Sequence, residues 1–183
     1  VCEPVHNLVH REVLKPQGAS FRSERAIDEQ QCEFLSSTDA WFRPTMAKTG
    51  PDGAIWIADM YRLVIEHPQW IPQEWQQKLD LRAGSDRGRI WRVVPESAMI
   101  RKIPRWDQLS TEALVALLES GNGTVRDLTQ ERLVAQADPE AIVSLKKLVR
   151  ESRRPSARLH ALWTLQLLKG LDWESLQIGL QDV

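Results

Sequence analysis

The sequence predicts a mixed fold, in which partial β-propeller blades are followed by an α-solenoid. Three observations lead to this prediction. Short runs rich in β-branched and aromatic residues fill the first part of the chain. After Pro104 the apolar spacing becomes helical. Each half also contains an internal repeat, which is typical of repetitive architectures. We therefore expect two domains, at residues 1–97 and 98–183.

Turn signals separate the strand-length runs of the first domain. The runs cover residues 7–14, 19–25, 45–50, 54–59 and 88–94. The sequence "KPQG" at 15–18 is expected to close a hairpin, and "GPDG" at 50–53 is also a turn signal. Residues 66–87 break the pattern. They are expected to form a long insertion, with a short helix from Pro72 to about Leu79.

Five helices are expected in the second domain. Their starts carry capping residues, or proline at the first helical position: Ser110, Asp138-Pro139, Pro155 and Asp172. The expected helices run over about 110–120, 124–136, 139–151, 155–169 and 172–181. The first of them ends just before Gly121, a residue that commonly follows a helix.

The helical segments repeat along the chain. "TVRDLTQERL" (124–133) aligns with "SARLHALWTL" (156–165) at an offset of 32, and Asp138 aligns with Asp172 at an offset of 34. A period of 30 to 40 residues built from two short helices indicates an α-solenoid. Because a solenoid end without a polar cap exposes apolar surface, further repeats are expected after the final "LQDV".

The Val-Arg and Ala-Arg pairs at the start of these segments resemble HEAT-like repeats. On that interpretation Arg126 and Arg158 are structural, and each bonds to the neighbouring repeat rather than to a ligand. His160 lies near Trp163 on the same helix. We expect it to be a packed histidine of the solenoid.

The strand-rich half also aligns with itself. When "CEPVHNLVHR" (2–11) is placed over "ADMYRLVIEH" (58–67), Glu3 falls on Asp59 and His6 on Arg62. In the same alignment Leu8-Val9 falls on Val64-Ile65. We interpret the two copies as successive blades of a propeller, whose blades are four-stranded sheets. Fewer than two complete blades are present, so the missing blades of the same protein are expected partners for the unpaired edges.

Composition excludes several classes of function. The net charge of −1 argues against a nucleic-acid binder, which would usually carry a basic face. No apolar run approaches the ~20 residues needed to span a bilayer, and no histidine or cysteine spacing indicates a metal site. Cys2 and Cys32 either form one disulfide or remain free thiols. The chain starts with Val1 rather than Met, as expected for a fragment or a processed chain.

Four stretches resemble one family: "CEPVHNLVHREVL", "EFLSSTDAWFRPTMAKTGPDGAIWIADMYRLVIEHPQWIP", "LDLRAGSDRGRIWRVVP" and "ARLHALWTL". They are similar to the large, secreted membrane-bound dehydrogenase proteins of planctomycetes and verrucomicrobia. The resemblance implies a propeller like that of the glucose/sorbosone quinoprotein dehydrogenases, then HEAT repeats, and often a c-type cytochrome module further on. It also implies a periplasmic or secreted location. The haem-attachment pattern CxxCH is absent, so no haem is assigned to this stretch.

The resemblance also suggests where the chemistry would lie. "WFRP" (41–44) precedes one strand and "DMYR" (59–62) follows the next, so both can reach the same channel mouth. Arg43 and Arg62 are candidates for binding the carboxylates of pyrroloquinoline quinone by paired hydrogen bonds, with calcium, in the full-length protein. No cofactor is evident from this stretch alone.

The remaining candidates would contact substrate. Glu3, Asn7, Asp59 and Tyr61 are candidates for binding a sugar, and His6 is a candidate general base because histidine titrates near neutrality. His10 is a weaker candidate for that base. Structural alternatives remain open. Asp59 and Arg62 can form a structural pair at a strand end, and Trp41 and Trp56 are more often core residues than sugar platforms.

Two functions follow from the sequence. The first is a quinoprotein-like sugar or alcohol dehydrogenase, with HEAT repeats as scaffold and electrons passing to the cytochrome c module. The second is a non-catalytic scaffold that binds carbohydrate or protein. In either case the fragment alone is expected to be inactive, because a propeller active site needs all blades.

Overall fold

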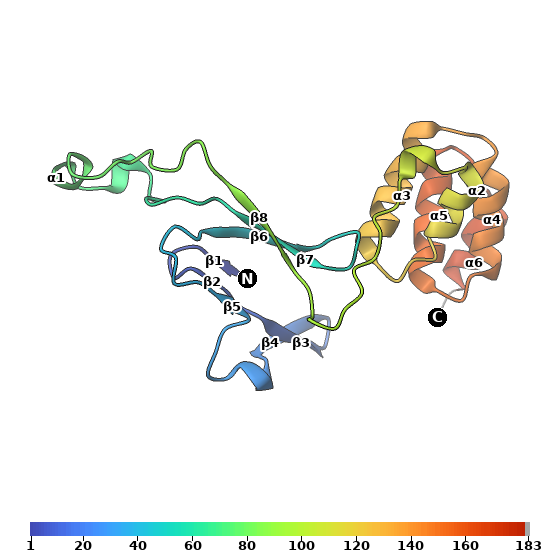
Figure 1. Ribbon diagram of the computed structural model, residues 1–183. Helices are drawn as coiled ribbons and strands as arrows, with labels where there is room; N and C mark the ends of the chain where they lie inside the picture. The colour runs from blue at the N-terminus through green and yellow to red at the C-terminus, as the bar shows by residue number, and fades with distance from the viewer. Residues whose placement is uncertain (182–183) are drawn as a thin grey trace. The chain divides into compact units, whose positions relative to one another are not determined.

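The computed structural model describes residues 1–181 and divides into two compact units. The first unit, rich in strands, comprises Val1–Lys48 and Ala54–Ala98. The second unit, which is helical, comprises Met99–Val183 together with the short segment Thr49–Gly53. The predicted order of strands followed by helices is confirmed (Figure 1).

Eight strands form three sheets in the strand-rich unit. The first sheet has the order β1-β2-β5, the second is the hairpin β3-β4, and the third has the order β6-β7-β8. The strands are β1 (Cys2–Glu3), β2 (Leu8–Val9), β3 (Glu12–Gln17), β4 (Ser20–Arg25), β5 (Leu35–Ser36), β6 (Pro44–Thr49), β7 (Ile55–Asp59) and β8 (Arg89–Val93). No sheet among the described residues has the four strands of a propeller blade.

The predicted hairpin forms, but its turn lies further along the chain. Strand β3 continues through the expected turn to Gln17, which pairs with Ser20 of β4. Gly18 has a φ of 59° and supplies the left-handed conformation of the tight turn. Pro16 remains inside β3, opposite Phe21. Both strands of this two-stranded sheet are edges, where proline is tolerated.

A long connection joins β7 to β8, as the sequence predicts. It contains a 3₁₀ turn, Pro68–Trp70, and α1 (Gln73–Gln76), which is shorter than the helix expected to reach Leu79. The predicted alignment of residues 2–11 with residues 58–67 is wrong at one point. Residues Val64-Ile65 were aligned with strand β2, but they lie in this connection and form no strand.

Five α-helices form the helical unit: α2 (Thr111–Leu117), α3 (Gly123–Gln136), α4 (Ala141–Glu151), α5 (Pro155–Leu167) and α6 (Trp173–Leu180). They pack in two layers, with α4 between α2 and α6 in one layer and α3 beside α5 in the other (Figure 1).

Predicted capping residues start three of these helices. The side chains of Ser110 and Asp172 accept hydrogen bonds from the amides of Ala113 and Ser175, and Pro155 opens α5. Helix α4 begins at Ala141, later than predicted. Asp138 accepts a bond from the amide of Glu140 at 3.0 Å, so it caps the turn that precedes the helix.

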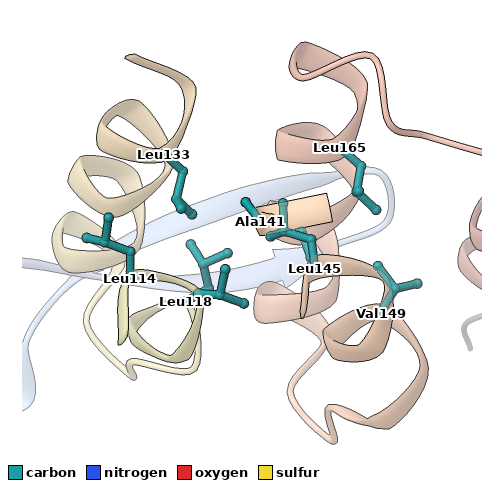
Figure 2. Packing of buried hydrophobic residues seen from close by; sticks show 9 residues of the cluster. Leu114, Leu118, Leu133, Ala141, Leu145, Val149 and Leu165 are labelled. Atoms are coloured by element: carbon teal, nitrogen blue, oxygen red, sulfur yellow. The ribbon is translucent and has the colours of Figure 1, made fainter. Parts of the chain in front are cut away.

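Leucine side chains fill the space between the two layers. Nine buried residues form one cluster, and Figure 2 labels seven of them: Leu114, Leu118, Leu133, Ala141, Leu145, Val149 and Leu165. They come from α2 and the residue that follows it, and from α3, α4 and α5, so each of these helices has its apolar face turned toward the same core. This shared burial, rather than propensity alone, stabilises helices as short as α2.

Polar contacts in the helical unit recur at an interval of 32 residues. The Nη1 atoms of Arg126 and Arg158 donate to the carbonyls of Ser120 and Ser152, at 2.8 Å and 2.6 Å. Each serine carbonyl lies in the loop before the arginine's own helix. Each of these bonds therefore joins the arginine to the loop that follows the preceding helix, which fits the structural role predicted for both arginines.

The ends of the two helices recur as well. Ala137 after α3 and Lys169 after α5 both have left-handed backbone conformations, with φ of 51° and 58°. The helices α3 and α5 thus begin and end with matching local structures.

Candidate functional site

The candidate site centres on Asp59, the last residue of β7. Its carboxylate is buried and accepts four hydrogen bonds. Oδ1 accepts from the amides of Arg43 and Tyr61, at 2.8 Å and 2.9 Å. Oδ2 accepts from Arg89 Nε at 2.9 Å and from Trp91 Nε1 at 3.0 Å. Every donor belongs to the chain itself.

These donors determine the charge state of Asp59. Burial alone would raise the pKa of its carboxyl group. The hydrogen bonds from Arg43, Trp91, Tyr61 and Arg89 outweigh burial and hold the pKa below its ordinary value. Asp59 is therefore an anion over the physiological range, and it is already satisfied as an acceptor.

Arg89 is the ion-pair partner of Asp59. It lies opposite Asp59 in the register of β7 and β8, and it also bonds Asp39 Oδ2 through Nη2 at 3.2 Å. Its guanidinium stacks 3.9 Å from the ring centre of Tyr61 and 4.9 Å from that of Trp91. Such contacts suit the flat, weakly hydrated guanidinium. The suggested pairing of Asp59 with Arg62 is thus wrong, because Arg89 takes that place.

Arg43 is bonded to backbone carbonyls on two sides. Nε donates to Arg62 O at 3.0 Å and Nη2 to Leu63 O at 3.1 Å. Nη1 donates to Pro4 O at 2.7 Å and, less closely, to Val5 O at 3.3 Å. The side chain fastens the β1–β2 turn and the segment after β7 together. All three of its nitrogens are engaged in this role.

Arg62 links the two ends of the long connection. Its Nη1 donates to Arg87 O at 3.2 Å and lies 3.4 Å from Tyr61 O. Gly84 crosses the same place with a φ of 85°, and a Cβ there would lie 2.5 Å from Tyr61 O. The backbone can approach this closely only because residue 84 is glycine.

The β1–β2 turn brings the N-terminal candidates to the same region. Asn7 has a left-handed backbone (φ 59°), and its amide donates to the carbonyls of Ala40 and Phe42. Glu3 Oε1 accepts from the amide of Val5 at 2.8 Å, just as Asp59 accepts from the amide two residues further on. The aligned pair Glu3 and Asp59 therefore makes the same local contact.

The histidine candidates lie apart from this network. The side chain of His6 is 73% exposed, and its ring lies 3.7 Å from Glu3 Oε1. His10 lies between two carboxylates, with Nδ1 2.7 Å from Glu33 Oε2 and Nε2 3.2 Å from Glu12 Oε1. Those bonds, chiefly the one to Glu33, raise the pKa of His10. Both ring nitrogens of His10 are therefore already bonded to carboxylates of the chain.

The predicted residues thus converge at the end of β7. Arg43 directs all three of its side-chain nitrogens at backbone carbonyls, and Nη1 of Arg62 donates to the carbonyl of Arg87. Among residues 1–181, no group of three or more histidines, cysteines or acids is arranged to hold a metal ion. Cys2 and Cys32 are both free thiols.

Sequence reasoning missed three members of the network: Asp39, Arg89 and Trp91. A signal for Arg89 was present. If "AIWIAD" pairs antiparallel with "GRIWRVV", the acid that ends one strand faces the arginine that begins the other. No local pattern indicated Asp39, which lies 50 residues from its partner.

A family model described as "Domain of unknown function (DUF7133)" matches residues 1–97. The comparisons with curated proteins and with solved structures each gave no match. Of the helices in the described part of the chain, none is both long enough and apolar enough to cross a membrane.

Proposed function

The chain belongs to the family described as "Domain of unknown function (DUF7133)", and we propose that it is part of a non-catalytic binding scaffold. In this proposal the strand-rich unit contributes partial β-propeller blades, and the helical unit is a HEAT-like α-solenoid that holds a partner. One observation carries the proposal. The charged groups that converge at the end of β7 are bonded to the chain itself.

A side chain that binds or transforms a ligand needs donor or acceptor atoms that are not already bonded within the protein. A guanidinium has five N–H donors, and Arg43 directs all three of its nitrogens at backbone carbonyls. Asp59 accepts two bonds on each oxygen. Releasing either side chain would leave partly buried backbone groups unpaired, at up to about 1–3 kcal/mol for each group. This arrangement favours a fixed frame over a reactive centre.

The repeated contacts of α3 and α5 support the solenoid part of the proposal. A stack of helix pairs buries a continuous core and exposes long faces, on which many such proteins bind partners. The proposal also keeps the missing blades, further repeats and carbohydrate as partners. It places the protein in the periplasm or outside the cell.

A sugar or alcohol dehydrogenase is the second candidate. The observation that favours it is the convergence itself, since Arg43, Arg62, Asp59 and Tyr61 meet at one end of the β6-β7-β8 sheet. The resemblance to quinoprotein dehydrogenases supplies the cofactor, pyrroloquinoline quinone with calcium, and the cytochrome c module. In this candidate the missing blades would contribute the residues that bind them.

The natural full-length protein separates the two functions. It should be supplied with pyrroloquinoline quinone and calcium, and dye reduction should be followed across a panel of sugars. The scaffold proposal expects no sugar-dependent turnover. Turnover that depends on both quinone and sugar would overturn it. If turnover occurs, equal activity of Arg43→Lys and wild-type protein would exclude a direct role for Arg43 in binding the quinone.

A further inference from the structure

The outer face of α5 differs from that of α3 in one respect. At an offset of 32 residues the buried positions match: Val125 with Ala157, and Leu133 with Leu165. The outward positions do not match in chemistry. Helix α3 presents Asp127, Glu131 and Ala135, whereas α5 presents Leu159, Trp163 and Leu167 at the equivalent places.

These three α5 side chains form an exposed apolar stripe. They follow one another at intervals of four residues, so they lie along one side of the helix. Leu159 is 55% exposed, Trp163 58% and Leu167 53%. The equivalent positions of α3 show that the repeat folds with polar or small residues there. The stripe is therefore not required by the helix packing.

A groove lies between this stripe and α3. Its volume is about 450 Å³, and its lining includes Asp127 and Glu131 on one side and Leu159 and Trp163 on the other. His160 and Gln130 form the floor, joined by a 2.7 Å bond between His160 Nδ1 and Gln130 Oε1. His160 is thus packed as predicted, with 17% of its side chain exposed.

The charge of the groove selects its occupant. None of the six described residues that line it is lysine or arginine, and two are acids. Burial, and to a lesser extent the nearby Arg126, lower the pKa of His160, so the floor is neutral at pH 7. A ligand with apolar groups and positive charge would satisfy both walls, whereas an anionic membrane surface or a nucleic acid would be repelled.

The spacing adds a geometric requirement. Asp127 and Glu131 are one helical turn apart, and so are Leu159 and Trp163, which corresponds to about 5–6 Å along each helix. An amphipathic helix presents side chains at this same interval. Its lysines or arginines would face the two carboxylates, and Trp163 adds a flat ring on which a cation can rest.

We propose that the groove between α3 and α5 binds an amphipathic helical segment of a partner protein that carries leucine-like and basic side chains. This inference rests on the proposed scaffold function and assigns its docking face. The binding test does not depend on enzyme activity. Quinone-dependent turnover would overturn the proposed scaffold function, whereas the affinity of the groove for a peptide is measured separately.

The test uses the 183-residue chain and a labelled peptide of leucine, alanine and lysine. A length of about 15 residues lets the peptide become helical when bound, since shorter isolated helices are marginal in water. A second peptide has glutamate in place of lysine. By fluorescence anisotropy, the lysine peptide should bind at least about tenfold more tightly than the glutamate peptide, and added salt should weaken it.

Two variants locate the binding. The first, Leu159→Asp with Trp163→Glu and Leu167→Ala, gives α5 the outer residues of α3, and it should lose at least about tenfold in affinity. The second, Asp127→Asn with Glu131→Gln, keeps the shape and should lose the preference for lysine. Val143→Glu, on the exposed side of α4, is the matched control and should bind as the wild type does.

Several results would overturn the proposal. They are no binding of the lysine peptide, equal binding of both peptides, or wild-type affinity in either groove variant. An equal loss in Val143→Glu would show that binding is not specific to this groove. Self-association of the wild type, abolished by the triple substitution in sedimentation experiments, would assign the face to a second copy instead.

Discussion

The strand-rich unit and the helical unit are stabilised in different ways. Six apolar residues are buried in the described part of the strand-rich unit, and two of them are alanines: Val9, Ala26, Phe42, Pro44, Ala54 and Ile57. At its centre is the carboxylate of Asp59 with four donors. The helical unit instead buries one continuous apolar cluster that contains five leucines.

This difference determines how each unit responds to change. Apolar burial is roughly proportional to area and has little dependence on direction. Hydrogen bonds to a buried charge depend on the position of every donor, and leaving one group unpaired is costly. The helical unit should therefore tolerate polar changes at its surface, whereas the strand-rich unit should be sensitive to single polar atoms near β7.

The largest expected effect is in the helical core. Leu145→Ala removes a fully buried side chain on α4 and should lower the free energy of unfolding of the helical unit by about 2–5 kcal/mol. Hydrogen exchange resolved by peptide reports each unit separately. Val143→Ala, on the same helix but 75% exposed, should change it by less than about 0.5 kcal/mol. Similar losses in both variants would contradict the apolar core described here.

The next effect tests the polar frame of the strand-rich unit. Asp59→Asn keeps the size of the side chain but places an amide N–H₂ group against donors, and it leaves Arg89 without its main counter-ion. We expect a loss of about 2–4 kcal/mol, confined to the strand-rich unit. Asp86→Asn is the control, because the Asp86 side chain is 83% exposed. If the two variants unfold alike, Asp59 is not the centre of this unit.

The helical unit could be predicted from the sequence almost element by element. Ser110, Pro155 and Asp172 act within four residues along the chain, so the local pattern contains the whole signal. The start of α4 was predicted too early because Asp138 caps the turn before the helix. The other oxygen of Asp138 accepts from the hydroxyl of Thr111, a distant partner that no local pattern indicates.

The candidate site could be predicted only in part. Asp59 and Arg43 stood out because polar groups follow or precede apolar strands. Their roles depend on partners 16 to 50 residues away, such as the amide of Arg43 on Asp59 and the pairing of Arg89 with Asp39. A 29-residue connection separates β7 from β8. The pairing of Asp59 with Arg89 can therefore be predicted only by aligning β7 with β8 across this connection.

A smaller effect is expected where the long connection crosses the strand-rich unit. Gly84→Ala would place a Cβ 2.5 Å from Tyr61 O at a φ of 85°, and should cost about 2–3 kcal/mol. Gly18→Ala is the matched control. It also has a positive φ, but nothing lies within 4 Å, so only the backbone cost of about 1 kcal/mol is expected. Thermal unfolding of both variants, measured by circular dichroism, isolates the steric contribution.

The smallest expected effect is on the pH dependence of stability, which should have opposite signs in the two units. Bonds to Glu33 and Glu12 raise the pKa of His10. The contribution of His10 to the stability of the strand-rich unit is therefore fully present below the unfolded pKa of about 6.5, and it is lost as the pH rises through the folded pKa. Burial lowers the pKa of His160, with a smaller contribution from Arg126, and together they outweigh the nearby Asp127 carboxylate, which raises it. The contribution of His160 to the stability of the helical unit is therefore present above about pH 6.5 and is lost as the pH falls through the folded pKa.

Lowering the pH from about 8 to about 5.5 should therefore stabilise the strand-rich unit and destabilise the helical one. Hydrogen exchange, corrected for the intrinsic effect of pH, measures both in one sample. His10→Asn should remove the trend from the strand-rich unit alone, and His160→Asn from the helical unit alone. A common direction in both units would mean that other groups dominate, and that the environments of the two histidines are not as different as their contacts indicate.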